Sequence, residues 1–423
     1  METRGIRSQA VRIARSLRHR NFKLFFVGQS VSLIGTWLTR VATSWLVYRL
    51  THSAQLLGLV SFAGLIPTFV IAPVAGVLAD RWNKRRALVA TQVAALLQSA
   101  ALAALTISGR ITITELVWLS VFQGVINAFD MPIRQSMLVH MIEDRADLPN
   151  AIALNSSMVN MARLVGPSFA GILIAIVGEG GCFAIDAVSY LAVIATLLMM
   201  SFPARTAAKA PAKHVHREIA EGFQYAWRSR PVLAVLGLLA LVSLMGAPYM
   251  TLLPIIVGQL GGDAKSLGYL TGASGLGALG GALFLAARTS SIGLGRIIAV
   301  SAFAFGASLV LFGLSRSIWL SLPIMVVCGL GMMLQMAASN TVLQTLTDER
   351  RRGRVMSLFL MSFTGTQPVG SLIAGYLAER IGAARTLELG GLACCAAALA
   401  FARALPRIRR SARRITEPIE MAE

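Results

Sequence analysis

A short charged segment between two long apolar runs most constrains how this chain can fold. Residues 76–88 read Gly-Val-Leu-Ala-Asp-Arg-Trp-Asn-Lys-Arg-Arg-Ala-Leu, and the flanking apolar runs cover residues 56–78 and 87–108. Each run is long enough for a helix that crosses a hydrocarbon core of about 30 Å, which takes roughly 20 residues. Two helices with so short a connection must lie side by side and antiparallel. The basic cluster places this connection in the cytoplasm, because basic loops resist translocation.

The composition is that of a polytopic membrane protein. Of the 423 residues, 56% are hydrophobic and 14% are charged, whereas a soluble domain carries about 25% charged residues. The net charge of +20 comes mainly from the two tails, the central loop and the run at residues 350–352. Membrane topology requires this distribution, and anionic lipid is its natural counter-charge. We therefore expect the lipid bilayer as a partner and no nucleic acid.

The hydropathy pattern predicts an all-α integral membrane fold of twelve transmembrane helices in two pseudo-symmetric six-helix bundles. An even number of spans places both termini in the cytoplasm of a multi-pass plasma membrane protein, in the bacterial inner membrane. The predicted spans are residues 22–48, 55–78, 87–108, 114–135, 150–177, 181–202, 232–257, 266–287, 294–314, 318–341, 355–379 and 386–405. The predicted domains are a basic tail (1–21), an N-terminal bundle (22–202), a linker with an amphipathic helix (203–230), a C-terminal bundle (231–405) and a second basic tail (406–423).

The two predicted bundles repeat in sequence. Residues 165–171 read Val-Gly-Pro-Ser-Phe-Ala-Gly, and residues 369–375 read Val-Gly-Ser-Leu-Ile-Ala-Gly. Both segments occupy the fifth span of their half and the same side of the membrane. This indicates a parallel duplication about an axis along the membrane normal. It predicts a central site between the halves that is reached alternately from each side.

Polar residues inside the predicted spans should face a cavity or one another, because burying them in lipid is costly. In the first span they recur every three or four residues, which places them on one helical face. We expect these polar side chains to line a substrate cavity: Gln29, Thr36, Arg40, Thr43, Asn127, Asn160, Gln335 and Gln367.

The intramembrane charges lie in the first half. Burial favours the neutral form of a carboxyl group and a nearby Arg favours the charged form, so movement of the Arg between states would load and unload a proton. The residues proposed for proton coupling are Asp130, Arg163 and Asp186. We expect Asp130 to carry the proton, with Arg163 or Arg134 as its partner; the alternative is a static ion pair. Arg40 either contacts an anionic group of the substrate or has a permanent partner such as Asp186.

The segment of residues 76–88 resembles the loop signature of the major facilitator superfamily, G-x-L-A-D-R-x-G-R-[KR]-x-x-L. The matching positions are Gly76, Leu78, Ala79, Asp80, Arg81, Arg85 and Leu88, while Asn83 and Lys84 depart from the pattern. The resemblance implies that Asp80 closes a cytoplasmic gate against the start of the eleventh span. The gate residues are Asp80, Arg81, Arg85, Arg134 and Arg354. The alternative is that this cluster only sets topology.

The fifth span resembles the antiporter signature G-x-x-x-G-P-x-x-G-G, with Ala at two Gly positions. Small residues allow close helix approach, and proline allows bending. We expect helix packing at Gly76, Gly166, Pro167, Gly171, Gly370 and Gly375. The span-four motif L-x-x-x-R-x-x-Q-G has Ser120 in place of the Arg that the family associates with proton coupling.

Further stretches resemble the branch of the enterobactin exporter and the macrolide-efflux-like permeases, including residues 32–37, 128–135, 148–156 and 353–357. This implies a secondary transporter that exports a siderophore, drug or other small amphipathic molecule, with protons as coupling ion. We expect a monomer, although the sequence leaves the oligomeric state open. An importer or lipid transporter of the same fold is an alternative. A membrane enzyme or a non-transporting scaffold is a third reading, but the sequence has no nucleophile motif, phosphate loop or helical His pair. We expect no enzyme activity, no cofactor and no metal.

Overall fold

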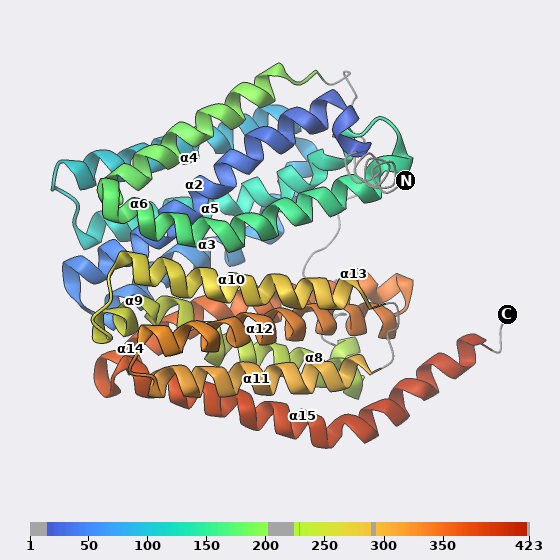
Figure 1. The fold of residues 1–423 in the computed structure, drawn as a ribbon. Coiled ribbons are helices and arrows are strands. Elements are labelled where there is room, and N and C mark those ends of the chain that lie inside the picture. Colours follow the sequence, from blue (N-terminus) through green and yellow to red (C-terminus); the bar gives the residue numbers. More distant parts are fainter. Residues whose placement is uncertain (1–14, 202–223, 228, 289–292, 421–423) are drawn as a thin grey trace, which may run out of the picture. The chain divides into compact units, whose positions relative to one another are not determined.

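The computed structural model describes residues 15–201, 224–227, 229–288 and 293–420, and the regular structure in these ranges is helical (Figure 1). Most of the predicted linker and the first 14 residues of the N-terminal tail lie outside the described residues. The long helices of the first half are α2 (Arg20–Thr51), α3 (Ala54–Arg81), α4 (Lys84–Ile107), α5 (Ile113–Leu138) and α6 (Leu148–Met199). Those of the second half are α8 (Arg230–Leu241), α9 (Tyr249–Gln259), α10 (Ala264–Ala286), α11 (Leu294–Leu314), α12 (Ile318–Leu346), α13 (Glu349–Leu360), α14 (Thr366–Ile381) and α15 (Ala383–Glu420).

Nine helical segments of the described chain are long and apolar enough to cross a membrane. One of them contains α6, a run of 52 residues that covers the fifth and sixth predicted spans. At Gly178 the backbone leaves the helical path with φ +71°, a conformation that glycine adopts without strain. This break lies where the sequence predicts the connection between those two spans. The protein is therefore an all-helical, multi-pass membrane protein.

Contacts divide the chain into two compact units. The first unit comprises residues 1–46 and 66–211, and the second comprises residues 47–65 and 212–423. The end of α2 and the start of α3 thus group with the second unit, because Gly58 lies against Gly375 and the Ser53 hydroxyl donates to the Glu379 carboxylate at 3.0 Å.

The first unit has an apolar core near the start of α2. Phe22 and Phe25 of α2 pack there with Leu88 of α4, Ile133 of α5 and Leu197 of α6. All five side chains are at most 2% exposed. This core fixes one end of the four helices, so the polar residues farther along α2, α4, α5 and α6 are held in register.

The second unit contains two short π-helical segments, Val242–Gly246 between α8 and α9 and Met361–Gly365 between α13 and α14. The Ser243 hydroxyl donates to the Phe363 carbonyl and joins them. A π-helical segment inserts extra backbone into a helix and leaves a carbonyl without its usual partner. Here a serine from the neighbouring segment supplies one of the missing hydrogen bonds.

Candidate functional site

Asp186 in α6 is the most enclosed carboxyl group of the described spanning helices. It is 1% exposed. Its Oδ2 atom accepts hydrogen bonds from Thr39 of α2 and Ser99 of α4, both at 2.7 Å. Its Oδ1 atom lies against Gly35 of α2 and has no hydrogen-bond partner in the described structure. Asp186 therefore connects three helices through hydroxyl groups.

Asp130 in α5 has a different environment. Its Oδ1 atom accepts from Gln92 at 2.7 Å and from Thr91 at 3.1 Å, both in α4. Its Oδ2 atom lies 3.5 Å from an Nη atom of Arg134, one helical turn away. Arg134, one of the two partners that the sequence suggested, thus forms an ion pair with Asp130. The Asp130 carboxyl group thus accepts from an amide and a hydroxyl of α4 and lies beside a guanidinium of its own helix.

A buried phenol lies within electrostatic range of the two carboxyl groups. Tyr190 follows Asp186 by one helical turn in α6 and is 5% exposed. It interacts with Asp186, with Asp130 and with the hydroxyl of Thr36. Asp186, Tyr190 and Asp130 of the first unit thus interact electrostatically. The sequence analysis missed Tyr190, Thr91 and Gln92, although their place in helices that carry or face an Asp was a usable signal.

Arg40 lies on the same helix as Thr39 but does not pair with Asp186. Its guanidinium carbon lies 5.0 Å from the centroid of the Trp37 ring, which is within cation–π range. Trp37 in turn packs on Gly166 of α6, where an added Cβ would lie 2.6 Å from the Trp37 Cβ. Arg163 precedes Gly166 by three residues, on the same helical face, and it acts electrostatically on Arg40. Trp37 thus contacts Arg40 of its own helix and Gly166 of α6.

The other predicted cavity residues fall into two groups. Gln29 and Gln335 are buried, and the Gln335 Nε2 atom has no hydrogen-bond partner in the described structure. Asn127 is exposed and accepts from Gln123 on its own helix at 3.1 Å. The half-buried residues are Thr36, Thr43, Asn160 and Gln367. Gln335 and Gln367 belong to the second unit and the others to the first, so a shared cavity remains an expectation.

The predicted gate residues have separate environments. Arg85 donates to the carbonyls of Leu197 and Leu198 at 2.9 and 2.6 Å, which satisfies the last turn of α6 and complements its helix dipole. Arg134 pairs with Asp130, and Arg354 is half-buried in α13. The side chains of Asp80 and Arg81 lie outside the described part of the chain.

Close helix approach occurs at several of the predicted packing positions. Gly166 receives Trp37, Gly370 lies against the Leu244 carbonyl and Gly375 lies against Gly58. Pro167 and Gly171 are buried within α6. At Gly76, by contrast, an added Cβ would meet no described atom within 4 Å.

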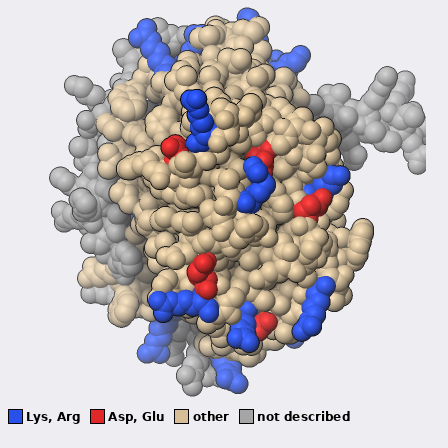
Figure 2. Space-filling model, turned by 90° about the vertical axis from the view of Figure 1, so that its left-hand side faces the viewer, with Lys and Arg blue, Asp and Glu red and all other residues tan. Residues whose placement is uncertain are grey.

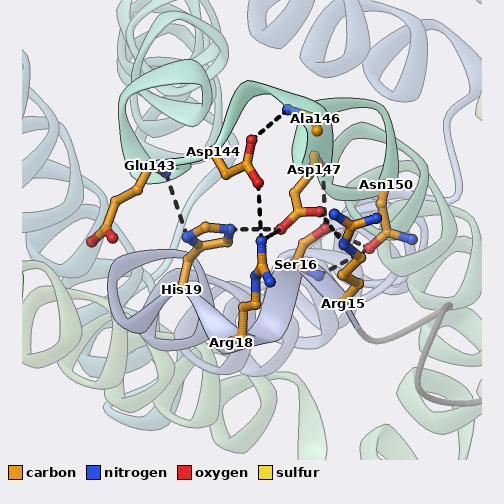
Figure 3. Close-up of polar contacts among 9 residues, drawn as sticks. All are labelled: Arg15, Ser16, Arg18, His19, Glu143, Asp144, Ala146, Asp147 and Asn150. Atoms are coloured by element: carbon orange, nitrogen blue, oxygen red, sulfur yellow. Dashed lines mark hydrogen bonds and ion pairs between the residues drawn. The ribbon is translucent and has the colours of Figure 1, made fainter.

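A group of ion pairs that the sequence analysis did not identify ties the start of the chain to the loop before α6. We call this group the N-terminal clasp (Figure 3). Asp147 is fully buried and lies 2.6 Å from Arg15 Nε, 2.7 Å from Arg18 Nη2 and 2.9 Å from His19 Nε2. The Ser16 amide donates to Asn150 Oδ1 at 3.1 Å. The sequence signal that could have identified Asp147 is its position directly before a helix whose second residue is proline. Carboxylates are favoured at such a helix start.

The second unit has a contact at the corresponding place in its own half. The Arg351 guanidinium lies 5.0 Å from the Tyr225 ring centroid. Burial and the nearby Asp348 carboxylate raise the pKa of the Tyr225 hydroxyl, although Arg351 opposes this. In each unit, the segment before the first long helix therefore contacts residues at or near the start of a later helix. In the first unit the central group of this contact is the Asp147 carboxylate before α6. In the second unit it is the Tyr225 ring, which Arg351 of α13 contacts.

Charged side chains are sparse on the face drawn in Figure 2. Where grey atoms do not cover this face, acidic and basic side chains lie scattered on a mostly uncharged surface.

A family model described as "Transmembrane secretion effector" matches residues 13–420. The chain belongs to this family of the major facilitator superfamily. Its curated relatives include the staphyloferrin A transporter of Staphylococcus aureus, 25% identical over 90% of this chain and 95% of that protein. The multidrug efflux pump Tap of Mycolicibacterium fortuitum is 26% identical over 82% of this chain and 87% of the pump. The enterobactin exporter EntS of Escherichia coli is 23% identical over 85% of each chain.

Solved transporter structures have the same fold. The nucleoside transporter NupG superposes with a TM-score of 0.68 at 15% identity, covering 92% of this chain and 98% of that one. The POT family transporter PepTSo gives 0.70 at 12% identity, covering 93% and 99%. The resemblance to the major facilitator superfamily drawn from the sequence is thus confirmed, and so is the expectation of a transport protein rather than an enzyme.

Proposed function

We propose that this family member is a proton-coupled exporter of a small amphipathic molecule, a siderophore, drug or metabolite, working by alternating access. Its twelve spans form two six-helix bundles, residues 22–202 and 231–405, in the bacterial inner membrane with both termini in the cytoplasm. The siderophore and drug transporters among its relatives support the direction and the class of cargo. The observation that carries the proton coupling is the environment of Asp186.

A proton fits Asp186 better than Asp130. The Asp186 carboxyl is held by hydroxyl groups, whereas Asp130 has a guanidinium and an amide. Ser189 lies against the same glycine as Asp186 Oδ1 and donates its own hydrogen to the Asp186 backbone carbonyl at 2.7 Å. The Oδ1 atom has no hydrogen-bond partner in the described structure, which leaves this oxygen open to a proton.

Tyr190 and Asp130 complete the proposed path. A proton released from Asp186 would meet the Tyr190 hydroxyl and then Asp130, whose ion pair with Arg134 would weaken as Asp130 is protonated. Protonation of Asp130 would also weaken the hydrogen bonds that it accepts from Thr91 and Gln92 of α4, which would couple movement of α5 against α4 to proton transfer. The residues in this proposal are Asp186 as carrier, Tyr190 as link and Asp130 as the exchange partner.

The test is substrate-induced proton release from the full-length protein in proteoliposomes with an internal pH dye. The compounds are iron-free siderophores and cationic and neutral drugs, added to wild type, Asp186→Asn and Asp130→Asn. We expect release in wild type, loss in Asp186→Asn and partial retention in Asp130→Asn. Asparagine resembles the neutral Asp in shape, so folding should persist. Asp263→Asn, in the loop before α10, is the matched control.

Each alternative result has a definite meaning. If substrate-induced proton release were lost in Asp130→Asn alone, Asp130 rather than Asp186 would be the residue that carries the coupled proton. A transported compound that releases no proton from wild type would refute proton antiport. Failure of every compound to be transported would refute the exporter proposal for these chemical classes.

A further inference from the structure

The end of α2 and the start of α3 form a helical hairpin whose connection is only two residues long. α2 ends at Thr51 and α3 begins at Ala54, and we call residues 47–65 the α2–α3 hairpin. The turn residue His52 has φ +51°, a conformation that residues other than glycine adopt only where the surrounding structure holds them. The His52 amide donates to the Tyr48 carbonyl at 2.7 Å, and the two rings meet edge-on with centroids 4.9 Å apart. The two helix ends are therefore held together as one piece.

This hairpin packs closely on two helices of the second unit. An added Cβ on Gly58 of α3 would lie 2.6 Å from the Ser371 carbonyl oxygen and 3.0 Å from the Gly375 Cα atom, both in α14. Glycine on both helices allows their backbones to approach in this way. On the α2 side of the hairpin, the Tyr48 hydroxyl lies against Gly258 of α9. The glycine contacts fix where the hairpin meets α9 and α14.

A carboxylate of α14 completes the start of α3. Glu379 Oε2 accepts from the Ser53 hydroxyl at 3.0 Å and from the Gln55 amide at 3.1 Å. The Ser53 hydroxyl also accepts from the Leu56 amide at 3.3 Å, as a helix-capping serine does. The first N–H groups of a helix have no partner within it, and a negative charge is favoured there. The first turn of α3 has no acidic residue, so Glu379 supplies this charge from another helix.

The hairpin is continuous at both ends with the first unit, although its contacts group it with the second. Residues 1–46 and 66–211 belong to the first unit, and residues 47–65 belong to the second. A movement between the two units must therefore bend α2 and α3 near residues 46 and 66, or release the hairpin from α14. Release requires that the two hydrogen bonds to Glu379 break.

We infer that Glu379 is a latch for the α2–α3 hairpin: its carboxylate caps α3 from α14 and sets how readily the hairpin leaves α14 during transport. Glu379 is a positioning residue, because it acts through the start of α3 and not on the transported molecule. This assignment rests on the proposed alternating-access export. It adds to that function the contact that controls one of the conformational steps, and such steps often limit turnover.

A cysteine at the first residue of α3 reports release of the hairpin. Ala54 is 3% exposed and its carbonyl oxygen lies against Gly375, so Ala54→Cys should react with a maleimide only while the hairpin is away from α14. The full-length protein is labelled in detergent, and the rate at each cysteine is followed by mass spectrometry. We expect Glu379→Ala to raise the rate at position 54 about threefold to tenfold, because α3 loses both an acceptor and a charge at its start.

Matched variants separate the latch from a general loss of structure. Glu379→Gln keeps an acceptor oxygen without the charge, so it should give a smaller increase. Arg380→Gln changes the next residue, whose guanidinium carbon lies 4.5 Å from the Tyr376 ring centroid, and it should label like the parent protein. The native thiols of Cys328 and Cys394 are buried in the second unit and should stay unlabelled in every variant.

An unchanged rate at position 54 in Glu379→Ala would overturn the inference. An equal rise at Cys328 and Cys394 would also overturn it, because it would show general unfolding. Glu379→Ala should in addition change the maximal rate at which proteoliposomes transport the siderophores and drugs, and faster labelling without such a change would refute a role in transport. Transport by the parent protein with unchanged labelling would refute the latch and leave export intact. The expected labelling without transport of any compound would refute export and leave the control of the hairpin by Glu379.

Discussion

Glycines in the first unit leave room for side chains, whereas several in the second unit leave room for neighbouring backbone. Gly35 accommodates the Asp186 carboxyl, and Gly166 accommodates Trp37. In the second unit Gly306 and Gly391 lie against each other's carbonyl oxygens, and Gly277 lies against that of Val326. The second arrangement brings helix axes close together and builds a rigid bundle. The first arrangement creates space for chemistry inside the bundle.

The buried polar groups follow the same division. In the part of the chain that the structure describes, every buried carboxyl group lies in the first unit: Asp130, Asp147, Glu179 and Asp186. The buried polar side chains described in the second unit are hydroxyls and one amide: Ser243, Thr251, Thr271, Ser274, Ser301, Ser308, Ser321, Gln335, Ser339, Thr347, Ser371 and Thr386. The comparison suggests that the buried carboxyl groups of the first unit take part in proton chemistry. The second unit is then a rigid helix bundle whose described buried polar groups are uncharged.

The largest expected effect is on the rigid packing of the second unit. In Gly277→Ala the new methyl group would overlap the Val326 carbonyl oxygen of α12, so α10 and α12 must separate. Overpacking of this kind costs about 1–3 kcal/mol, and we expect a clearly lower melting temperature in detergent. Gly280→Ala, one turn along α10, is the control, because its nearest atom is Leu330 Cδ1 at 3.6 Å. Equal melting temperatures for the two variants would contradict the backbone-packing account.

A glycine substitution in the first unit should affect function more than folding. In Gly35→Ala the methyl group would overlap Asp186 Oδ1 and lie 2.6 Å from Ser189 Oγ. These are side-chain atoms that can rotate away, so the loss of stability should be smaller than in Gly277→Ala. The displaced carboxyl should reduce substrate-induced proton release several-fold. Gly28→Ala, which meets only Thr196, should release protons like wild type, and a similar loss there would count against a specific role for Asp186.

The smallest expected effect concerns the N-terminal clasp. Asp147→Asn removes the charge that three basic side chains share, so it should lower the melting temperature, though less than Gly277→Ala. Asp144→Asn removes an exposed partner of Arg18 at 3.1 Å and should have almost no effect, since exposed ion pairs contribute little. Both variants are compared by thermal unfolding in the same detergent. A larger effect for Asp144→Asn would show that the clasp is held by its outer rather than its buried carboxylate.

Much of the candidate site was predictable in kind but not in its pairings. The polar stripe of α2 and the charge asymmetry between the halves were evident, because an intramembrane charge is rare and its helical spacing gives its face. The sequence could not decide that Arg40 would stack on Trp37 or that Asp186 would bind Thr39 and Ser99. These partners come from helices far apart in the chain, and a rotation of one residue about a helix changes which side chains meet.

The sequence by itself determined that this protein is a helical membrane protein of the major facilitator superfamily. A lipid environment leaves few ways to satisfy backbone hydrogen bonds, so long apolar runs must become spanning helices whatever their neighbours are. Only the tertiary structure decided how the buried charges are distributed among partners. In the tertiary structure Asp130 forms an ion pair with an arginine, and Asp186 has three hydroxyl-bearing neighbours. Arg40 stacks on a tryptophan ring. Those choices depend on helix packing at glycines such as Gly35 and Gly166, where a single methyl group would change which atoms touch.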